Sequence, residues 1–179
     1  MRNKCYWKAR LKGMKIYTKV GDFGQTKLNN ELKNKNDLIF EVFGTIDMVQ
    51  SYLGLLYEET KDNKTLSEDL IKLMDLKYQL SSCLYLTKDF EEDYSLWLES
   101  KIDRYDKLLE PLTKFILPIG SRAVAISHIT RTHVRKLERN MVMYLNSENI
   151  KNVYPNILKY LNRLSDYLFM LARFLGEVK

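Results

Sequence analysis

The C-terminal part of the chain carries the pattern that most restricts the fold. Between residues 157 and 175, leucine and isoleucine recur at alternating spacings of four and three residues, at Ile157, Leu161, Leu164, Leu168, Leu171 and Leu175. This alternation places them on one stripe of an α-helix and is typical of a helix that packs in a bundle. Pro155 suits the first helical position, where the missing N–H costs nothing. The sequence therefore predicts a long amphipathic helix that begins at Pro155.

The same apolar period predicts four further helices. We expect them over residues 37–57, 65–86, 93–109 and 121–146, with Thr65 and Glu68 forming a capping box at the start of the second. The chain has only 7 glycines and 3 prolines among 179 residues, which favours long helices over a turn-rich β protein. The predicted fold is an all-α, five-helix up-and-down bundle.

Composition limits the classes of protein to which the chain can belong. Hydrophobic residues make up 45% and charged residues 29%, which is a globular balance. The net charge of +6 suits an anionic ligand, but acidic and basic residues are mixed along most of the chain, which disfavours nucleic acid as a partner. No apolar run reaches the roughly 18 residues of a membrane span. Cys5 and Cys83 form neither a disulfide framework nor a zinc set, so we expect a cytoplasmic protein.

The first 13 residues differ from the rest of the chain. They contain five basic residues and no acidic residue, and no apolar segment follows them as it would in a secretory signal. We interpret residues 1–13 as a flexible basic arm, or as a segment upstream of a start at Met14. Residues 14–179 are predicted to form a single domain.

Residues 127–140 concentrate charge on one helix face. Arg131, Arg135 and Glu138 are four and then three residues apart, and Lys136 and Arg139 lie beside them. Two arginines at this spacing repel by roughly 0.2–0.5 kcal/mol in an isolated helix, so helix propensity does not explain them. Guanidinium groups suit a polyphosphate or several carboxylates. The alternative is a solvated face in which Glu138 pairs with Arg135.

A glycine loop near the N-terminus is a second candidate for binding phosphate. Gly21 and Gly24 let the backbone turn and expose N–H groups, although their spacing matches neither a Walker A loop nor a Rossmann fingerprint. Side chains that suit phosphate surround them, namely Thr18, Lys19, Thr26 and Lys27. The alternative is a plain turn between two short strands. Residues 29–36 are polar and are interpreted as a loop, with Lys35 near its end.

Three further features leave alternatives open. Asp47 lies at the edge of the first helix's apolar stripe and is either solvated or paired with an arginine from elsewhere. Phe115 belongs to an apolar loop, F-I-L-P-I-G, that is either core filler or a wall for a large flat ligand. Phe169 shares a stripe of the last helix with Asn162, Asp166 and Arg173, which suggests a ligand or subunit contact unless it is a stray surface aromatic.

Metal chemistry has little support in the sequence. His128 and His133 are five residues apart, which does not place both on one metal. The chain contains no Glu-x-x-His, so the di-iron bundle pattern is absent. We therefore predict no metal site formed by protein residues alone.

Three segments together resemble the trimeric ATP:corrinoid adenosyltransferases of the propanediol-utilisation type. They are T-K-V-G-D-F-G-Q-T with E-V-F-G-T-I-D, F-I-L-P-I-G with R-T-H-V-R-K-L-E-R, and K-Y-L-N-R-L-S-D. Their order and spacing agree with the family from Met14 to the C-terminus. The resemblance implies a ferritin-like helical bundle with an N-terminal ATP-binding loop. It also implies transfer of the 5′-deoxyadenosyl group of ATP to cob(I)alamin, with release of triphosphate.

The resemblance also implies roles for individual residues. ATP, with Mg²⁺, would be bound by Thr18, Lys19, Gly21, Asp22, Gly24, Gln25, Thr26, Lys27, Lys35, Arg135, Lys136, Glu138, Arg139 and Asn162. Arg131 matches an arginine that pairs across the subunit interface with the residue at Asp47. Phe115 matches the phenylalanine that crowds the lower face of the corrin. The implied partners are two further copies of the chain in a homotrimer, a cobalt reductase and an adenosylcobalamin-dependent enzyme.

Two positions depart from the family pattern. Met48 stands where the family usually has Glu, and Ile119 replaces the first Gly of L-P-G-G. Two other interpretations compete with the enzyme, namely a catalytically silent ATP-binding regulatory bundle and a basic bundle that binds nucleic acid or protein partners. Cobalt(I) is itself a strong nucleophile, so the lack of a Ser/His/Asp set is consistent with the enzyme.

Overall fold

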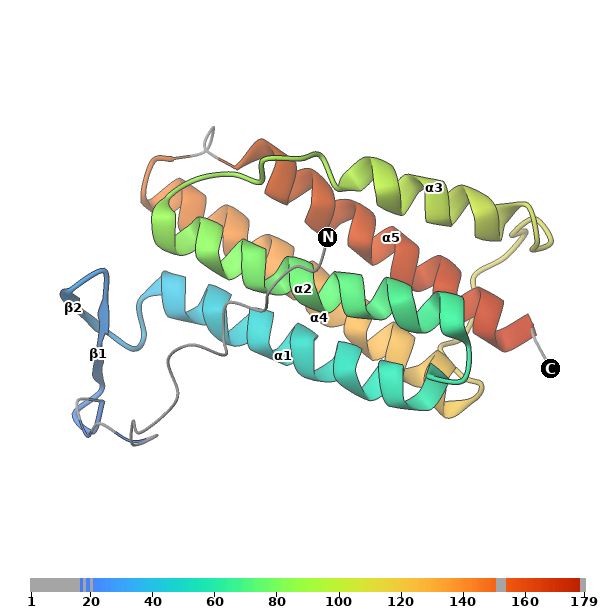
Figure 1. Ribbon diagram of the computed structural model, residues 1–179, viewed down its shortest axis with the longest axis horizontal. Coiled ribbons are helices and arrows are strands. Elements are labelled where there is room, and N and C mark those ends of the chain that lie inside the picture. The colour runs from blue at the N-terminus through green and yellow to red at the C-terminus, as the bar shows by residue number, and fades with distance from the viewer. Residues whose placement is uncertain (1–16, 18, 20, 151–153, 178–179) are drawn as a thin grey trace. The chain divides into compact units, whose positions relative to one another are not determined.

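The computed structural model describes residues 17, 19, 21–150 and 154–177, and the chain divides into two compact units, Met1–Asn36 and Asp37–Lys179. The larger unit contains α1 (Leu38–Thr60), α2 (Lys64–Leu86), α3 (Ser95–Asp106), α4 (Arg122–Ser147) and α5 (Pro155–Glu177). Successive helices run in opposite directions (Figure 1). The predicted five-helix up-and-down bundle is confirmed. The predicted division into an arm of residues 1–13 and one domain of residues 14–179 stays a prediction, and the arm lies outside the described residues.

The helices pack as the apolar stripes require. α4 packs against both α1 and α5, α2 packs against α1, and α3 packs against α5. The α5 stripe is buried from Ile157 to Leu171, and only Leu175 is partly exposed. Burying one such side chain stabilises the fold by about 1.5–3 kcal/mol. The length and mean hydropathy of α1, 1.2, would also allow a membrane span, but in the bundle this helix packs against α2 and α4.

The start of α2 differs from the predicted capping box. Asn63 is the N-cap, and its side-chain oxygen accepts a hydrogen bond from the backbone N–H of Leu66 at 3.1 Å. Thr65 and Glu68 are exposed and lie inside the helix. Asparagine is among the best N-cap residues because its short side chain reaches the free N–H groups of the first turn. The N-cap therefore lies two residues before Thr65, the N-cap that the capping box predicts.

The described part of the smaller unit contains a hairpin that the sequence analysis interpreted as a loop. β1 (Gln25–Leu28) pairs antiparallel with β2 (Glu31–Asn34), with Thr26 opposite Lys33. The two residues between the strands, Asn29 and Asn30, have φ values of 51° and 65°. Asparagine tolerates this left-handed conformation, which a two-residue type I′ turn requires at both positions. The polar strands lack apolar alternation, so only the Asn-Asn turn could have revealed the hairpin.

Candidate functional site

The arginine face of α4 lines a cavity of about 540 Å³ between α3, α4 and α5. Arg131 and Arg135 enter it from α4, and Asp166 and Phe169 enter it from α5. Two members of the α5 stripe that was open to a ligand or subunit contact, Asp166 and Phe169, therefore share one cavity with the arginine face. Phe169 is half-buried there rather than a stray surface aromatic.

Arg131 and Asp47 have separate surroundings within one chain. The Nε atom of Arg131 is buried and has no hydrogen-bond partner among the described residues. The Oδ1 atom of Asp47 pairs with the Nζ atom of Lys77 at 2.9 Å, and the Asp47 side chain is 75% exposed. An exposed carboxylate gains little from one lysine and remains accessible to a second cation. The pairing of Arg131 with Asp47 of another subunit stays a prediction.

Glu138 does not pair with Arg135, as it would on a solvated helix face, but with a residue of α5. Its Oε1 atom accepts a hydrogen bond from the side-chain amide of Asn162 at 3.2 Å, which links α4 to α5. The guanidinium of Arg139 donates to the backbone oxygen of Arg135 at 3.1 Å. The structure thus brings Asn162 of α5 together with three residues of α4, namely Arg135, Glu138 and Arg139.

Lys136 is held from α1 by a residue that sequence reasoning did not single out. Its Nζ atom lies 2.8 Å from the Oε1 atom of Glu41, and this contact lowers the pKa of the Glu41 carboxyl. Asn140 donates hydrogen bonds to Glu41 at 3.3 Å and to the Thr45 hydroxyl at 2.9 Å. Glu41 opens the motif E-V-F-G-T-I-D, so its position in that motif was the available signal.

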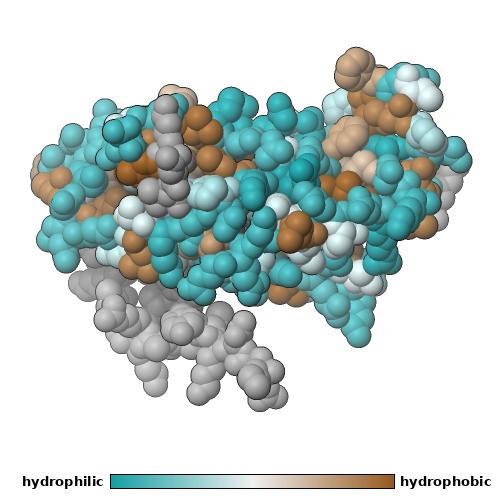
Figure 2. All heavy atoms as spheres, turned by 90° about the horizontal axis from the view of Figure 1, so that it is seen from above, coloured by the Kyte–Doolittle hydropathy of each residue, from teal (hydrophilic) through white to brown (hydrophobic). Residues whose placement is uncertain are grey.

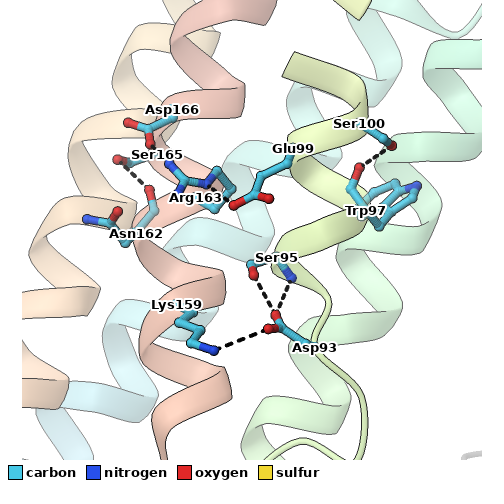
Figure 3. A network of polar contacts seen from close by, with 10 residues as sticks. All are labelled: Asp93, Ser95, Trp97, Glu99, Ser100, Lys159, Asn162, Arg163, Ser165 and Asp166. Carbon is cyan, nitrogen blue, oxygen red and sulfur yellow. Dashed lines mark hydrogen bonds and ion pairs between the residues drawn. The ribbon is translucent and has the colours of Figure 1, made fainter. Parts of the chain in front are cut away.

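A polar network between α3 and α5 forms one wall of the cavity (Figure 3). The guanidinium of Arg163 binds Glu99 of α3 at 3.0 Å and Asp166 of its own helix at 2.7 Å. Towards the start of both helices, Lys159 pairs with Asp93 at 3.3 Å. Sequence reasoning also missed Arg163, although it follows Asn162 directly. Because Arg163 is paired twice, the less engaged cations of this cavity are those of α4.

The smaller unit brings Lys35 to the glycine loop. The Nζ atom of Lys35 donates to the backbone oxygen of Gly21 at 2.7 Å, and its backbone N–H donates to Gly24 at 2.9 Å. Gly24 has a φ of 76°, and Lys19 has a φ of 60°. Both values lie in the left-handed region, so the backbone turns tightly here. Asp22, Gln25, Thr26 and Lys27 belong to the same turn and first strand, whereas Thr18 lies outside the described residues.

The loop between α3 and α4 presents apolar side chains to solvent. Phe115 is fully exposed, and Leu117 and Ile119 are more than 70% exposed. Figure 2 shows an apolar projection at one end of the bundle, the end at which α3 terminates and α4 begins in Figure 1. Core filler would be buried, so this loop fits the alternative of an apolar wall. A second cavity, of about 310 Å³, lies beside it and is lined by the loop, α4 and the end of α5.

Metal ligands do not cluster in the described part of the chain. No group of three or more His, Cys, Asp or Glu side chains there has an arrangement that could hold an ion. The arginines that line the large cavity can bind anions, and the loop between α3 and α4 offers an exposed apolar surface.

Comparison with known proteins shows the family to which this sequence is similar. The family model described as cobalamin adenosyltransferase matches residues 16–175. The chain is 38% identical over 168 residues to a corrinoid adenosyltransferase of Bacillus subtilis (strain 168), covering 89% of this chain and 86% of that protein. It is 37% identical over 175 residues to the corrinoid adenosyltransferase MMAB of Homo sapiens, covering 89% of this chain and 68% of that protein.

A solved structure agrees with the fold. It is that of a variant PduO-type ATP:corrinoid adenosyltransferase from Lactobacillus reuteri, complexed with cobalamin and ATP. The two chains superpose with a TM-score of 0.82 and 31% sequence identity, covering 90% of this chain and 91% of that chain. The likeness therefore extends over nearly the whole of both chains.

Proposed function

This chain belongs to the cobalamin adenosyltransferase family, and we infer from that premise that it is an enzyme that transfers the 5′-deoxyadenosyl group of ATP to a corrinoid. The products are the adenosylated corrinoid and triphosphate. The observation that carries the assignment of residues is the cavity lined by Arg131 and Arg135, in which Arg131 has a buried nitrogen without a partner among the described residues.

We propose that two sets of residues bind ATP. In the smaller unit, the turn around Gly21 and Gly24, with Lys35 beside it, contacts the phosphates. In the bundle, the contacts come from Arg135, Lys136, Glu138, Arg139 and Asn162. Nothing in the described chain resembles a metal cage, and Mg²⁺ commonly binds proteins through substrate phosphates. We therefore propose that Mg²⁺ enters with ATP.

The reaction needs positioning and charge stabilisation more than a protein nucleophile. The cobalt(I) centre of the corrinoid attacks C5′ of ATP, the Co–C bond forms, and the C5′–O bond breaks with its electron pair passing to triphosphate. The protein must hold C5′ in line with cobalt and stabilise the charge on the leaving group. Arg135 and Lys136 supply fixed positive charge for the second task.

Phe115 is proposed to form the wall against the lower face of the corrin. An apolar group there displaces the lower ligand of cobalt and makes reduction to cobalt(I) easier. Full exposure of Phe115 in the single chain leaves its ring free for such a contact. The departure at Ile119 lies in the same loop and lines the second cavity, so it changes the surroundings of the corrin rather than the arginine face.

We propose that the working enzyme is a cytoplasmic homotrimer with its sites at the subunit interfaces. Asp47 and its neighbour Met48 are both exposed on α1, as a contact with another copy requires. Arg131 of one subunit would then pair with Asp47 of the next. A cobalt reductase supplies the reduced corrinoid, and an adenosylcobalamin-dependent enzyme is the consumer of the product.

The decisive experiment is anaerobic turnover with ATP, Mg²⁺ and chemically reduced cobalamin. We expect the absorption spectrum to change to that of adenosylcobalamin, with one triphosphate released per product. The competing function is a silent ATP-binding regulator. It would give no product while ATP still raised the melting temperature.

A further inference from the structure

The second cavity contains a buried histidine that the proposed mechanism does not use. His128 lines it together with Val124 of α4, Ala172 and Arg173 of α5, and the loop that carries Phe115. Only 6% of His128 is exposed, and its ring lies against Phe169 with 6.3 Å between the ring centroids. A titratable side chain is thus enclosed at the edge of the proposed corrin wall.

His128 belongs to the same face of α4 as the arginines. It precedes Arg131 by three residues and Arg135 by seven, and these spacings return to one side of a helix. The face therefore runs from the large cavity, which the arginines line, to the second cavity, which His128 lines. A substrate pair spread along this face would meet cations at one end and a histidine at the other.

One of the two ring nitrogens of His128 lacks a hydrogen-bond partner. Its Nδ1 atom is buried and makes no hydrogen bond to any described residue. A buried polar atom left without a hydrogen bond costs on the order of 1–3 kcal/mol, and a ligand that supplies the bond recovers this cost. Two cations line this cavity, Lys114 and Arg173, and Arg173 is already engaged, because it donates to the backbone oxygen of Glu110 at 2.6 Å. Among the described side chains that line this cavity, the buried polar atom that still lacks a hydrogen bond is the Nδ1 atom of His128.

These properties select a neutral polar ligand. Burial, with Arg131 nearby, lowers the pKa of His128, so the imidazole is neutral at pH 7. A neutral imidazole has one donor nitrogen and one acceptor nitrogen, and a primary carboxamide has both a donor and an acceptor, so the two match in either tautomer. Corrinoids carry acetamide and propionamide groups around the ring. At about 310 Å³ the cavity is at the lower limit of ligand pockets, which suits a side chain better than a whole ring.

We propose that His128 binds the corrinoid through a hydrogen bond that the N–H of one peripheral carboxamide, entering the second cavity, donates to the unpartnered Nδ1 atom of the imidazole. This inference rests on the proposed function. It assigns to His128 the task of orienting the corrin ring over Phe115, separate from the binding of ATP by the arginines.

The test compares two substitutions of His128, one that removes the hydrogen-bonding group and one that retains a polar group. His128→Phe keeps the size of the ring and removes the hydrogen bond, whereas His128→Asn retains a polar group near the position of Nδ1. We expect His128→Phe to raise KM for cob(I)alamin about five- to tenfold with little change in KM for ATP. His128→Asn should restore most of the loss.

A change of substrate provides the matched control. Heptamethyl cobyrinate carries methyl esters in place of all peripheral amides. Because an ester has no N–H, it cannot donate a hydrogen bond to the imidazole of His128. With this corrinoid the wild-type protein and His128→Phe should have the same KM. An unchanged KM for cob(I)alamin in His128→Phe, with normal wild-type turnover, would overturn this inference alone. Wild-type protein without any turnover would overturn the proposed function as well.

A measurement on the wild-type protein covers the case in which His128→Phe does not fold. The chain has only 2 histidines, so the imidazole ¹⁵N signals can be assigned with one substitution, His133→Asn. Hydroxocobalamin should shift the His128 signals, and the ester corrinoid should not. Equal shifts with both corrinoids, or none with either, would contradict the proposed hydrogen bond.

Discussion

At the scale of single residues, the site depends on which cations have partners. Lys136 is held by Glu41, and Arg163 is held by Glu99 and Asp166. Arg135 is exposed and lines the large cavity. A guanidinium in this position can bind triphosphate without first losing a protein partner, which is why we assign it to the charge on the leaving group.

Substitution of Arg135 tests that assignment. We expect Arg135→Ala to lower kcat/KM at least a hundredfold, because it removes charge stabilisation of the leaving triphosphate. The melting temperature should stay close to that of the wild type, since an exposed arginine contributes little to stability. Arg104→Ala, on the exposed side of α3, is the matched control and should leave turnover unchanged. Near-normal turnover of Arg135→Ala would disprove the role.

His128 should also make stability depend on pH. Its pKa is lowered in the folded protein by burial and by Arg131, so the unfolded chain binds the proton more readily. The free energy of unfolding should therefore decrease as pH falls below about 6.5 and level off below the folded pKa. Urea unfolding at pH 7.5, 6.5 and 5.5 should show a smaller decrease for His128→Asn than for the wild type. Parallel curves would contradict the lowered pKa.

At the scale of elements, local capping and turn chemistry decided where helices and strands begin. The Asn63 cap started α2 upstream of the predicted capping box, and the Asn29–Asn30 turn produced a hairpin where a loop was expected. At Asn63 a side-chain hydrogen bond to the backbone decided the helix start, in place of the Thr65–Glu68 capping box. At Asn29 and Asn30 the left-handed backbone conformation decided the turn, in place of the polar composition of residues 29–36.

The α2 cap gives a direct stability prediction. Asn63→Ala removes the hydrogen bond to the Leu66 N–H and should lower the free energy of unfolding by about 1 kcal/mol. Thr65→Ala should have almost no effect, because Thr65 is exposed and lies within the helix. Chemical denaturation of the two variants measures the difference. A larger loss for Thr65→Ala would restore the capping box at Thr65 and Glu68.

The contact between Lys35 and the glycine loop gives a prediction on ATP binding. Lys35→Ala removes the bond to the Gly21 oxygen and one positive charge, so KM for ATP should rise about tenfold. Lys33→Ala, on the neighbouring strand, is the control, because Lys33 pairs with Glu31 at 3.6 Å. Steady-state kinetics at saturating cob(I)alamin distinguishes the two. The proposal fails if both substitutions change KM for ATP equally.

At the scale of the whole molecule, the proposed assembly depends on opposite charges in different copies. Arg131 has a buried nitrogen without a partner in the described chain, and Asp47 is largely exposed despite Lys77. A buried guanidinium nitrogen left unpaired is costly, so contact with a second subunit would benefit the fold as well as the site.

A charge exchange tests the trimer. Asp47→Arg and Arg131→Asp should each weaken assembly and activity, because like charges would meet at the interface. The double variant should recover both, at least in part. Analytical ultracentrifugation gives the assembly state. The control is Asp75→Arg, a substitution at an exposed position of α2. A trimer that is unaffected by either single substitution would contradict the pairing.

The sequence by itself determined the helices, their apolar faces and the motifs that place the chain in its family. These features follow from residue type and spacing along one element, and such periods survive without knowledge of any neighbour. Arg131, Arg135 and Phe169 could be singled out in this way.

Only the tertiary structure decided which of these faces meet and which side chains are already engaged. It placed Arg131 and Phe169 in one cavity, gave Lys136 to Glu41, and enclosed His128 beneath the loop of Phe115. Helical spacing puts His128 beside the arginines but cannot tell that its ring is buried against Phe169 of α5 and shares a cavity with the loop of Phe115. Burial and partnership are properties of contacts between distant segments, and a period along one helix contains no information on them.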